Sequence, residues 1–199
     1  MKITAIRPQQ KIRNRYSIYC DDRYSFSVSE AMLLEQGLVA GQELTMADLK
    51  KYKQLSSDDN SFNRALRYAA IRNHSQWEME QYLKRKDVSE DQSAVILARL
   101  ADLGFIDDKN FANSWVENRR LLKPVSRRRL EQELRQKHVN SEIIKAALEE
   151  DLTEELTVLK YLVAKKRLQS SYKDNQRLMG YLSRQGFSYD DIKTAMSDD

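Results

Sequence analysis

The sequence predicts a mainly α-helical protein, with three tandem three-helix repeats forming an elongated curved array behind a small N-terminal module of strands and helices. Three segments that begin at Met79, Leu130 and Leu178 align with one another, at periods of 51 and 48 residues. A fixed period of this size is typical of arrays in which each unit buries its apolar face partly against its neighbours. The chain has 199 residues but only five Gly and two Pro, which suits helices joined by short turns.

The sequence of residues 1–55 predicts that they form the small α+β module. Residues 2–7 alternate like a strand, and residues 13–21 and 24–28 alternate apolar with polar side chains. Asp21-Asp22-Arg23 lies between the last two segments and favours a hairpin turn. Two or three strands bury little apolar surface, so helices are expected to pack across them.

Two helices and a linker are expected next. The first helix runs from Ser29 to Gly37, and the second begins at a capping box of Thr45 with Asp48 and ends near residue 53. The stretch Ser-Ser-Asp-Asp-Asn-Ser at 56–61 is polar throughout, so we predict a linker there.

The three repeats are assigned to residues 62–108, 109–150 and 151–199. Their first helices are expected at 65–73, 111–121 and about 152–166. The second and third helices each carry an apolar pair spaced i, i+4, which places both side chains on one helix face. The pairs are Met79/Leu83, Leu130/Leu134 and Leu178/Leu182 in the second helices, and Ile96/Leu100, Ile144/Leu148 and Ile192/Met196 in the third.

The predicted helix ends carry their own signals. The aligned position after each second helix is Asp87, His138 or Gly186, three residue types enriched at positive φ. We therefore interpret His138 as a helix-end residue, not a functional histidine. Further expected caps are Ser75 with Glu78, Ser89 with Gln92, Ser188 with Asp191, and the acidic pair Asp107-Asp108 before the helix at 111.

Some polar residues have no predicted role. His74 has no obvious partner in the sequence. The acidic residues at 149–151 and 154–155 are expected on a solvated helix face or at a helix N-terminus. Neither histidine has metal-ligand spacing, so no metal site is expected.

Composition limits the function. The single cysteine, Cys20, cannot form an internal disulfide, lies in an apolar strand and is expected to be buried, which fits a reducing cytoplasm. No stretch approaches the ~18 apolar residues of a membrane helix, and no signal peptide is visible. Phosphate-binding glycine loops, GxSxG, HExxH and CxxC motifs are all absent from the sequence. We expect neither an enzyme nor a cofactor.

The charge is unevenly distributed. The net charge is +4, yet residues 119–137 hold eight basic and two acidic side chains. Close like charges repel, so this basic patch favours a polyanionic or acidic partner. The alternative is a solvated face whose cations pair with Glu117, Glu131 and Glu133.

The repeats resemble the RecX regulatory family. The resemblance is carried by Ala65 to Ser75, Met79 with Leu83 to Lys86, Leu100 to Ala112 and Ser126 to Leu134. It covers about residues 62–199, with the third repeat weakest, and the N-terminal module is similar to that of longer family members. The family's usual glycine after the second helix is replaced by Asp87 and His138 in the first two repeats.

This resemblance implies a cytoplasmic, monomeric regulator that binds the RecA–single-stranded DNA filament and inhibits its ATPase, coprotease and recombination activities, within the SOS response. Double-stranded DNA is a second option for the nucleic acid. No catalytic residues are implied. The candidate filament- or DNA-binding residues are Arg67, Arg72, Lys84, Arg85, Arg119, Arg120, Lys123, Arg127, Arg128, Arg129, Arg135, Lys165, Lys166, Arg167 and Arg184.

Other classes stay open on the residues alone. A sequence-independent DNA-binding helical-repeat protein would explain the basic patch, with residues 127–136 as the candidate recognition helix. A helical scaffold for a protein partner would need no such patch. A nuclease fits least, because no metal-binding carboxylate cluster is evident.

Overall fold

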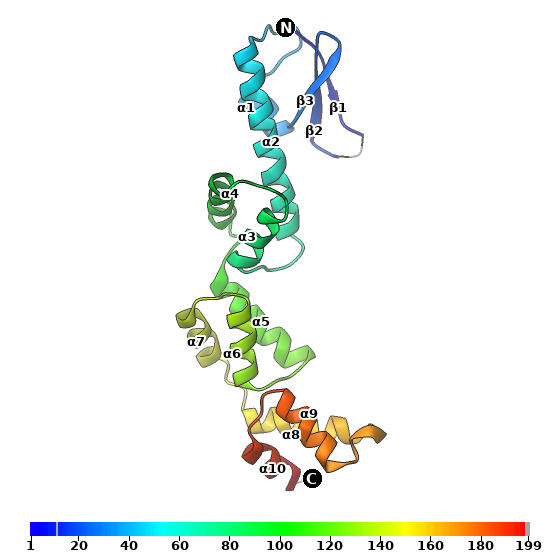
Figure 1. Cartoon of the computed structure of the whole chain (residues 1–199), viewed down its shortest axis with the longest axis vertical. Helices are drawn as coiled ribbons and strands as arrows, with labels where there is room; N and C mark the ends of the chain where they lie inside the picture. The colour runs from blue at the N-terminus through cyan, green and yellow to red at the C-terminus, as the bar shows by residue number, and fades with distance from the viewer. Residues whose placement is uncertain (11, 198–199) are drawn as a thin grey trace. The chain divides into compact units, whose positions relative to one another are not determined.

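The structure is a computed structural model that describes residues 1–10 and 12–197. These residues form one antiparallel sheet and ten α-helices (Figure 1). Contacts divide the chain into two compact units, residues 1–71 with 82–99 and residues 72–81 with 100–199. The elements are β1 (Ile3–Pro8), β2 (Arg15–Cys20), β3 (Arg23–Ser29), α1 (Glu30–Glu35), α2 (Met46–Ala69), α3 (Gln76–Lys84), α4 (Glu90–Asp102), α5 (Asp108–Leu122), α6 (Arg127–Gln136), α7 (Ser141–Glu150), α8 (Glu155–Arg167), α9 (Asn175–Arg184) and α10 (Tyr189–Ser197), with a short 3₁₀ turn η1 (Ser170–Tyr172) before α9.

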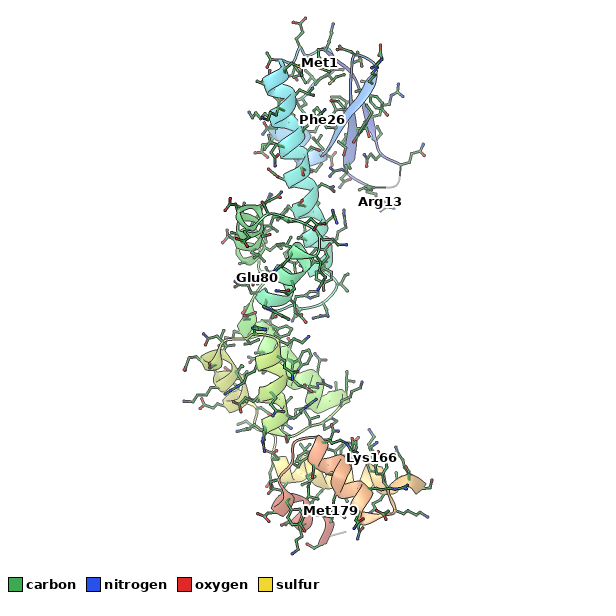
Figure 2. The ribbon with its side chains drawn as sticks, viewed as in Figure 1. Met1, Arg13, Phe26, Glu80, Lys166 and Met179 are labelled. Atoms are coloured by element: carbon green, nitrogen blue, oxygen red, sulfur yellow. The ribbon has the colours of Figure 1, made fainter. Side chains whose placement is uncertain are left out.

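The N-terminal sheet has the order β1-β2-β3 and is antiparallel throughout. Asp21 and Asp22 have φ values of 46° and 62°, so the predicted hairpin turn is confirmed. Helices α1 and α2 pack across the sheet (Figures 1 and 2). Phe26 of β3 stacks on Tyr52 of α2 with ring centroids 6.1 Å apart, and Cys20 is buried in the same core as predicted.

The predicted linker at 56–61 is wrong, because helix α2 runs through it without a break. The polar side chains there make tertiary hydrogen bonds. Ser56 donates its hydroxyl to the Ser27 carbonyl, and the Asp59 carboxylate accepts from Arg15 and from both the backbone and hydroxyl of Ser29. A polar, Gly-free stretch therefore continues the helix and ties it to β3. The separate helix expected at 65–73 is the last part of α2, which ends at Ala69.

The second unit contains two complete three-helix repeats, α5–α7 and α8–α10, each with its own apolar core. Leu134 and Leu182 are fully buried at equivalent positions of their cores, and Leu83 of the first repeat is 1% exposed. Their burial confirms the alignment of the repeats. The i, i+4 spacing explains it, since it turns both members of each pair toward the same side of the helix.

The predicted helix ends are confirmed. Asp87, His138 and Gly186 have φ values of 55°, 56° and 94°. At each of them the next residue donates its N–H to the carbonyl of the buried leucine five positions earlier, as His138 shows: Val139 donates to Leu134 at 3.2 Å. Asp107 caps α5 through the amides of Lys109 and Asn110. Serine hydroxyls accept from the expected residues at the other three caps.

None of the helices in the described part of the chain is both long and apolar enough to cross a membrane.

Candidate nucleic-acid interface

The basic patch, residues 119–137, covers the end of α5, a turn, and all of α6. Val125 is buried in the core of the middle repeat and anchors the turn. The Ser126 hydroxyl accepts from the Arg129 amide and starts α6 one residue later. This turn brings cations from both helices to one region of the repeat.

Two of these cations, Arg119 and Arg129, pair with the carboxylate of Glu133, a residue that is only 8% exposed. Arg119 forms two hydrogen bonds to its carboxylate, at 2.8 and 2.9 Å, and Arg129 lies 3.5 Å from it. The Trp115 indole N–H donates to the same carboxylate at 3.0 Å. Arg119 and Trp115 of α5 therefore hold that helix against α6, while Arg129 pairs with Glu133 within α6, and the charges of both arginines are partly cancelled.

Arg120 is also a structural residue. It donates to Asp151 from two nitrogens, at 2.9 and 2.7 Å, and to the carbonyl of Val125. The side chains of Arg120 and Asp151 are only 10% and 5% exposed. Burial alone raises the pKa of Asp151, but hydrogen bonds from Thr153 and Arg120 outweigh it and lower that pKa below its usual value. The sequence predicts Asp151 on a solvated helix face or at a helix N-terminus, whereas the structure places it directly after α7 with its side chain buried beside Arg120.

Three cations of the patch have no carboxylate partner among the described residues. Lys123 and Arg128 are exposed and form no ion pair with any residue of the described ranges. Arg127 donates to the carbonyl of Asp151, and Arg135 pairs with Glu131 on the surface at 2.6 Å. The pairing predicted by the solvated-face alternative thus occurs at Glu131 and Glu133, and it leaves Lys123, Arg127 and Arg128 as the exposed cations of the patch without an ion pair among the described residues.

A second cluster of charges surrounds Glu78, at the start of α3. Arg72 donates to it at 2.9 and 3.3 Å, Lys137 directly after α6 donates at 2.6 Å, and the Nδ1 of His74 lies at 3.3 Å. Burial alone raises the pKa of Glu78, but hydrogen bonds and charges from Arg72 and Lys137 lower it to about 2. His74, which has no obvious partner in the sequence, is buried against this carboxylate.

The start of α3 packs on the end of α6 in a joint between repeats. The Ser75 hydroxyl donates to the carbonyl of Lys137 at 2.9 Å, and Trp77 stacks on His138 with centroids 4.4 Å apart. The next joint uses the equivalent positions, because the Ser126 amide donates to the carbonyl of Gln185 at 3.1 Å. The cap serine of one repeat therefore contacts the second-helix end of the following repeat, twice.

Comparison with known proteins identifies relatives with the same order of domains. Four family models match in order: the regulatory protein RecX N-terminal domain at 1–45, and the first, second and third RecX three-helix domains at 62–100, 107–148 and 153–196. The regulatory protein RecX of Listeria innocua is 32% identical, over 98% of this chain and 74% of its own length. This chain belongs to the RecX family. The RecX of Bacillus subtilis is 33% identical, over 98% of this chain and 75% of its own length.

Solved RecX structures have the same fold. A crystal structure of a regulatory protein RecX superposes with a TM-score of 0.72 at 27% identity, over 98% of both chains. The RecX of Lactobacillus salivarius superposes with a TM-score of 0.59 at 26% identity, over 71% of this chain and 95% of its own. The predicted family and fold class are thereby confirmed, and the curated relatives bear the name of a regulatory protein.

The remaining candidate residues of this RecX chain fall into separate groups. Arg67, Lys84 and Arg85 are exposed in the first unit, and Arg184 is exposed on α9. The cations at the end of α8 are engaged locally: Lys165 lies over the Tyr161 ring, Lys166 over the rings of Tyr172 and Tyr181, and Arg167 donates to the Tyr172 and Lys173 carbonyls and to Asn175. Arg72 is half exposed while it pairs with Glu78.

The sequence interpretation missed the residues that organise this region, Glu78, Lys137 and Trp115. The sequence predicts Glu78 only as part of a helix cap and gives no functional role to Trp115. Their partners lie 59 residues apart for Glu78 with Lys137, and 18 apart for Trp115 with Glu133, so no local pattern reveals them. In the described part of the chain, no three His, Cys, Asp or Glu side chains are arranged to hold a metal ion.

Proposed function

We propose that this chain binds the RecA–single-stranded DNA filament and inhibits its ATPase, coprotease and recombination activities. The observation that carries the proposal is the match, over nearly the whole chain, to relatives that are regulatory proteins RecX. We further propose that the protein acts as a non-catalytic monomer in the cytoplasm.

The distribution of exposed cations supports this proposal. The first repeat offers Lys84 and Arg85, the middle repeat Lys123 and Arg128, and the third repeat Arg184. A filament presents the same phosphate and protein surfaces at regular intervals. Separate weak contacts to it add through effective concentration, while an isolated RecA subunit offers one contact at a time.

RecA ATPase on single-stranded DNA tests the proposal. We expect the full chain to lower the rate when it is present at about one copy per several RecA subunits. A Lys123→Ala/Arg128→Ala double variant should inhibit more weakly, and its dependence on salt should be shallower, since log affinity changes by about 0.7 per neutralised phosphate for each log of salt. Lys145→Ala/Lys193→Ala removes the same charge from other exposed helices and serves as the control.

An unchanged ATPase rate with the full chain would contradict the proposed regulation. Sequence-independent DNA binding is then the better function, and one observation favours it: the exposed cations Arg127 and Arg128 lie next to each other at the start of α6, where they could contact phosphates. Binding to bare single-stranded DNA as tight as binding to the filament would support that second function.

A further inference from the structure

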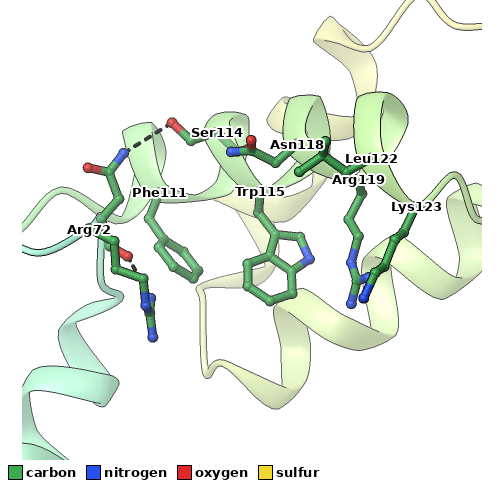
Figure 3. A pocket seen from close by; sticks show the side chains of 9 residues that line it. Arg72, Phe111, Ser114, Trp115, Asn118, Arg119, Leu122 and Lys123 are labelled. Carbon is green, nitrogen blue, oxygen red and sulfur yellow. Dashed lines mark hydrogen bonds between the residues drawn. The ribbon is translucent and has the colours of Figure 1, made fainter.

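A cavity of about 440 Å³ lies beside α5 in the second unit (Figure 3). Its lining combines two aromatic rings, three cations and several small polar groups. The lining residues are Arg72, Asn73, Phe111, Ser114, Trp115, Asn118, Arg119, Leu122 and Lys123. None of these nine residues is acidic, although the chain as a whole is almost balanced in charge.

The wall of the cavity is aromatic and preorganised. The rings of Phe111 and Trp115 lie side by side one helical turn apart, with centroids 5.7 Å apart (Figure 3). The indole is held by its hydrogen bond to Glu133, and cations of Arg119 and Lys137 lie over its ring, each 5.3 Å from the centroid. Binding a planar group here would cost little side-chain ordering, because the ring is already fixed.

The rim carries positive charge and amide groups. Arg72 lies at one end of the row of rings, and Arg119 and Lys123 at the other (Figure 3). Arg72 is paired with Glu78 and Arg119 with Glu133, whereas Lys123 has no ion pair within the described residues. Asn118 donates to the Ser114 carbonyl of its own helix, which leaves its exposed amide oxygen to accept from a ligand.

We propose that this cavity binds a nucleobase of single-stranded DNA, with the adjacent phosphates contacted by Lys123 and Arg72. The inference rests on the proposed function, and it deepens it by naming the site and the part of the nucleic acid that enters. Stacking on aromatic side chains beside a basic groove is how proteins bind single strands without sequence preference. An apolar protein side chain could also enter the cavity, but the unpaired ammonium of Lys123, the half-exposed guanidinium of Arg72 and the absence of an acidic residue from the lining favour a group flanked by phosphates.

Tryptophan fluorescence tests the site directly. The chain has two tryptophans, so Trp77→Phe leaves Trp115 as the only one and keeps an aromatic ring on His138. Titration with oligo(dT) should quench Trp115, and titration with an abasic oligonucleotide of the same length should not. The abasic strand should also bind about 10-fold more weakly, because each base–aromatic stack contributes about that factor.

Trp115→Leu in the otherwise native chain provides the second measurement. It should weaken oligo(dT) binding by about 10-fold and leave abasic-strand binding unchanged. Tyr161→Leu removes an exposed aromatic ring from α8 and should change neither affinity. Circular dichroism of both variants reports whether they fold. If Trp115→Leu does not fold, the fluorescence titration of the Trp77→Phe variant still tests whether a base binds at Trp115.

Three outcomes would overturn the proposed base site: equal binding of the two strands, no quenching of Trp115, or quenching by RecA alone to the same extent as by DNA. The last outcome would assign the cavity to a protein side chain. RecA ATPase measured on the same samples separates the two proposals. Inhibition without quenching leaves the regulatory function standing and removes the base site, whereas loss of inhibition by the full chain removes the proposed function itself.

Discussion

At the residue scale, two buried carboxylates join the helices of the second unit. The carboxylate of Glu78 contacts Arg72, Lys137 and His74. The carboxylate of Glu133 contacts Arg119, Arg129 and Trp115. A buried charge is stable only when it is paired and hydrogen-bonded. Both carboxylates meet that condition: Glu78 bonds to Lys137 at the end of α6, and Glu133 bonds to Arg119 and Trp115 of α5. Each carboxylate therefore links its own helix to another one.

Protonation of Glu78 should lower the free energy of unfolding of the protein at acidic pH. Its pKa is lowered from 4.5 to about 2 in the folded protein, so its contribution is complete above pH ~4.5 and is lost as pH falls toward 2. The contribution is on the order of 3 kcal/mol, since one pKa unit corresponds to about 1.4 kcal/mol. Urea unfolding followed by tryptophan fluorescence at pH 5 and pH 2.5 should show a smaller loss of stability for Glu78→Gln than for the native chain.

Glu142→Gln on the exposed start of α7 is the control for this pH series and should behave like the native protein. If Glu78→Gln and the native chain lose the same stability between the two pH values, the carboxylate does not have the lowered pKa that its contacts imply.

Gly186 should be the least replaceable glycine among the residues described. It has φ +94°, and an added Cβ would collide with the Ser126 hydroxyl and lie 3.0 Å from the Arg129 Cβ. Gly186→Ala therefore combines backbone strain of about 1–3 kcal/mol with overpacking of a similar size. Gly104 has φ +75° with nothing near its Cβ position, so Gly104→Ala should show the strain alone. Equal melting temperatures for the two variants would argue against the tight joint at Ser126.

At the element scale, α2 is the least expected feature. One helix of 24 residues serves both the N-terminal sheet and the first repeat. Polar composition usually marks a connection, but here Ser56 and Asp59 face the sheet and bond to β3. The continuity of α2 therefore depends on contacts with residues some 30 positions away in sequence.

A proline in α2 distinguishes a helix from a linker. Ser57 is exposed in the middle of the helix, so Ser57→Pro should destabilise the first unit by about 3 kcal/mol or more through a lost hydrogen bond and a clash with the preceding turn. Ser57→Ala keeps the helix and should change stability by less than about 0.5 kcal/mol. Thermal unfolding by circular dichroism compares them, and a tolerated proline would restore the linker interpretation.

At the scale of the whole molecule, the middle and third repeats have separate apolar cores. A chain that ends after residue 150 should therefore keep the fold of its first two repeats, although it loses the joint at Ser126 and the Asp151 partner of Arg120. Filament binding should weaken at least ~10-fold, because one set of linked contacts is removed. Inhibition of RecA ATPase by the two chains measures this, with circular dichroism as the folding control. Equal inhibition would exclude a contribution from the third repeat.

The periodic features of this protein are readable from sequence because their causes are local. The i, i+4 apolar pairs, the cap serines and the positive-φ residues each depend on a few neighbouring positions, and all three recur in each repeat. His138 is an example of a backbone conformation that the sequence predicts correctly. Its alignment with Gly186 predicted a left-handed helix end, and the structure gives it φ 56°.

The site could not be derived in this way, because the sequence shows how many basic residues a segment has but not which of them form ion pairs in the folded protein. The same arginine-rich segment holds buried structural residues, such as Arg120, and exposed ones, such as Arg128. Which is which depends on whether a carboxylate from a distant segment, Asp151 or Glu133, reaches the guanidinium once the helices have packed. The aromatic cavity beside Trp115 arises for the same reason: sequence alone established the repeats and their helix ends, whereas only tertiary packing decided which charges remained free and where a planar ligand could enter.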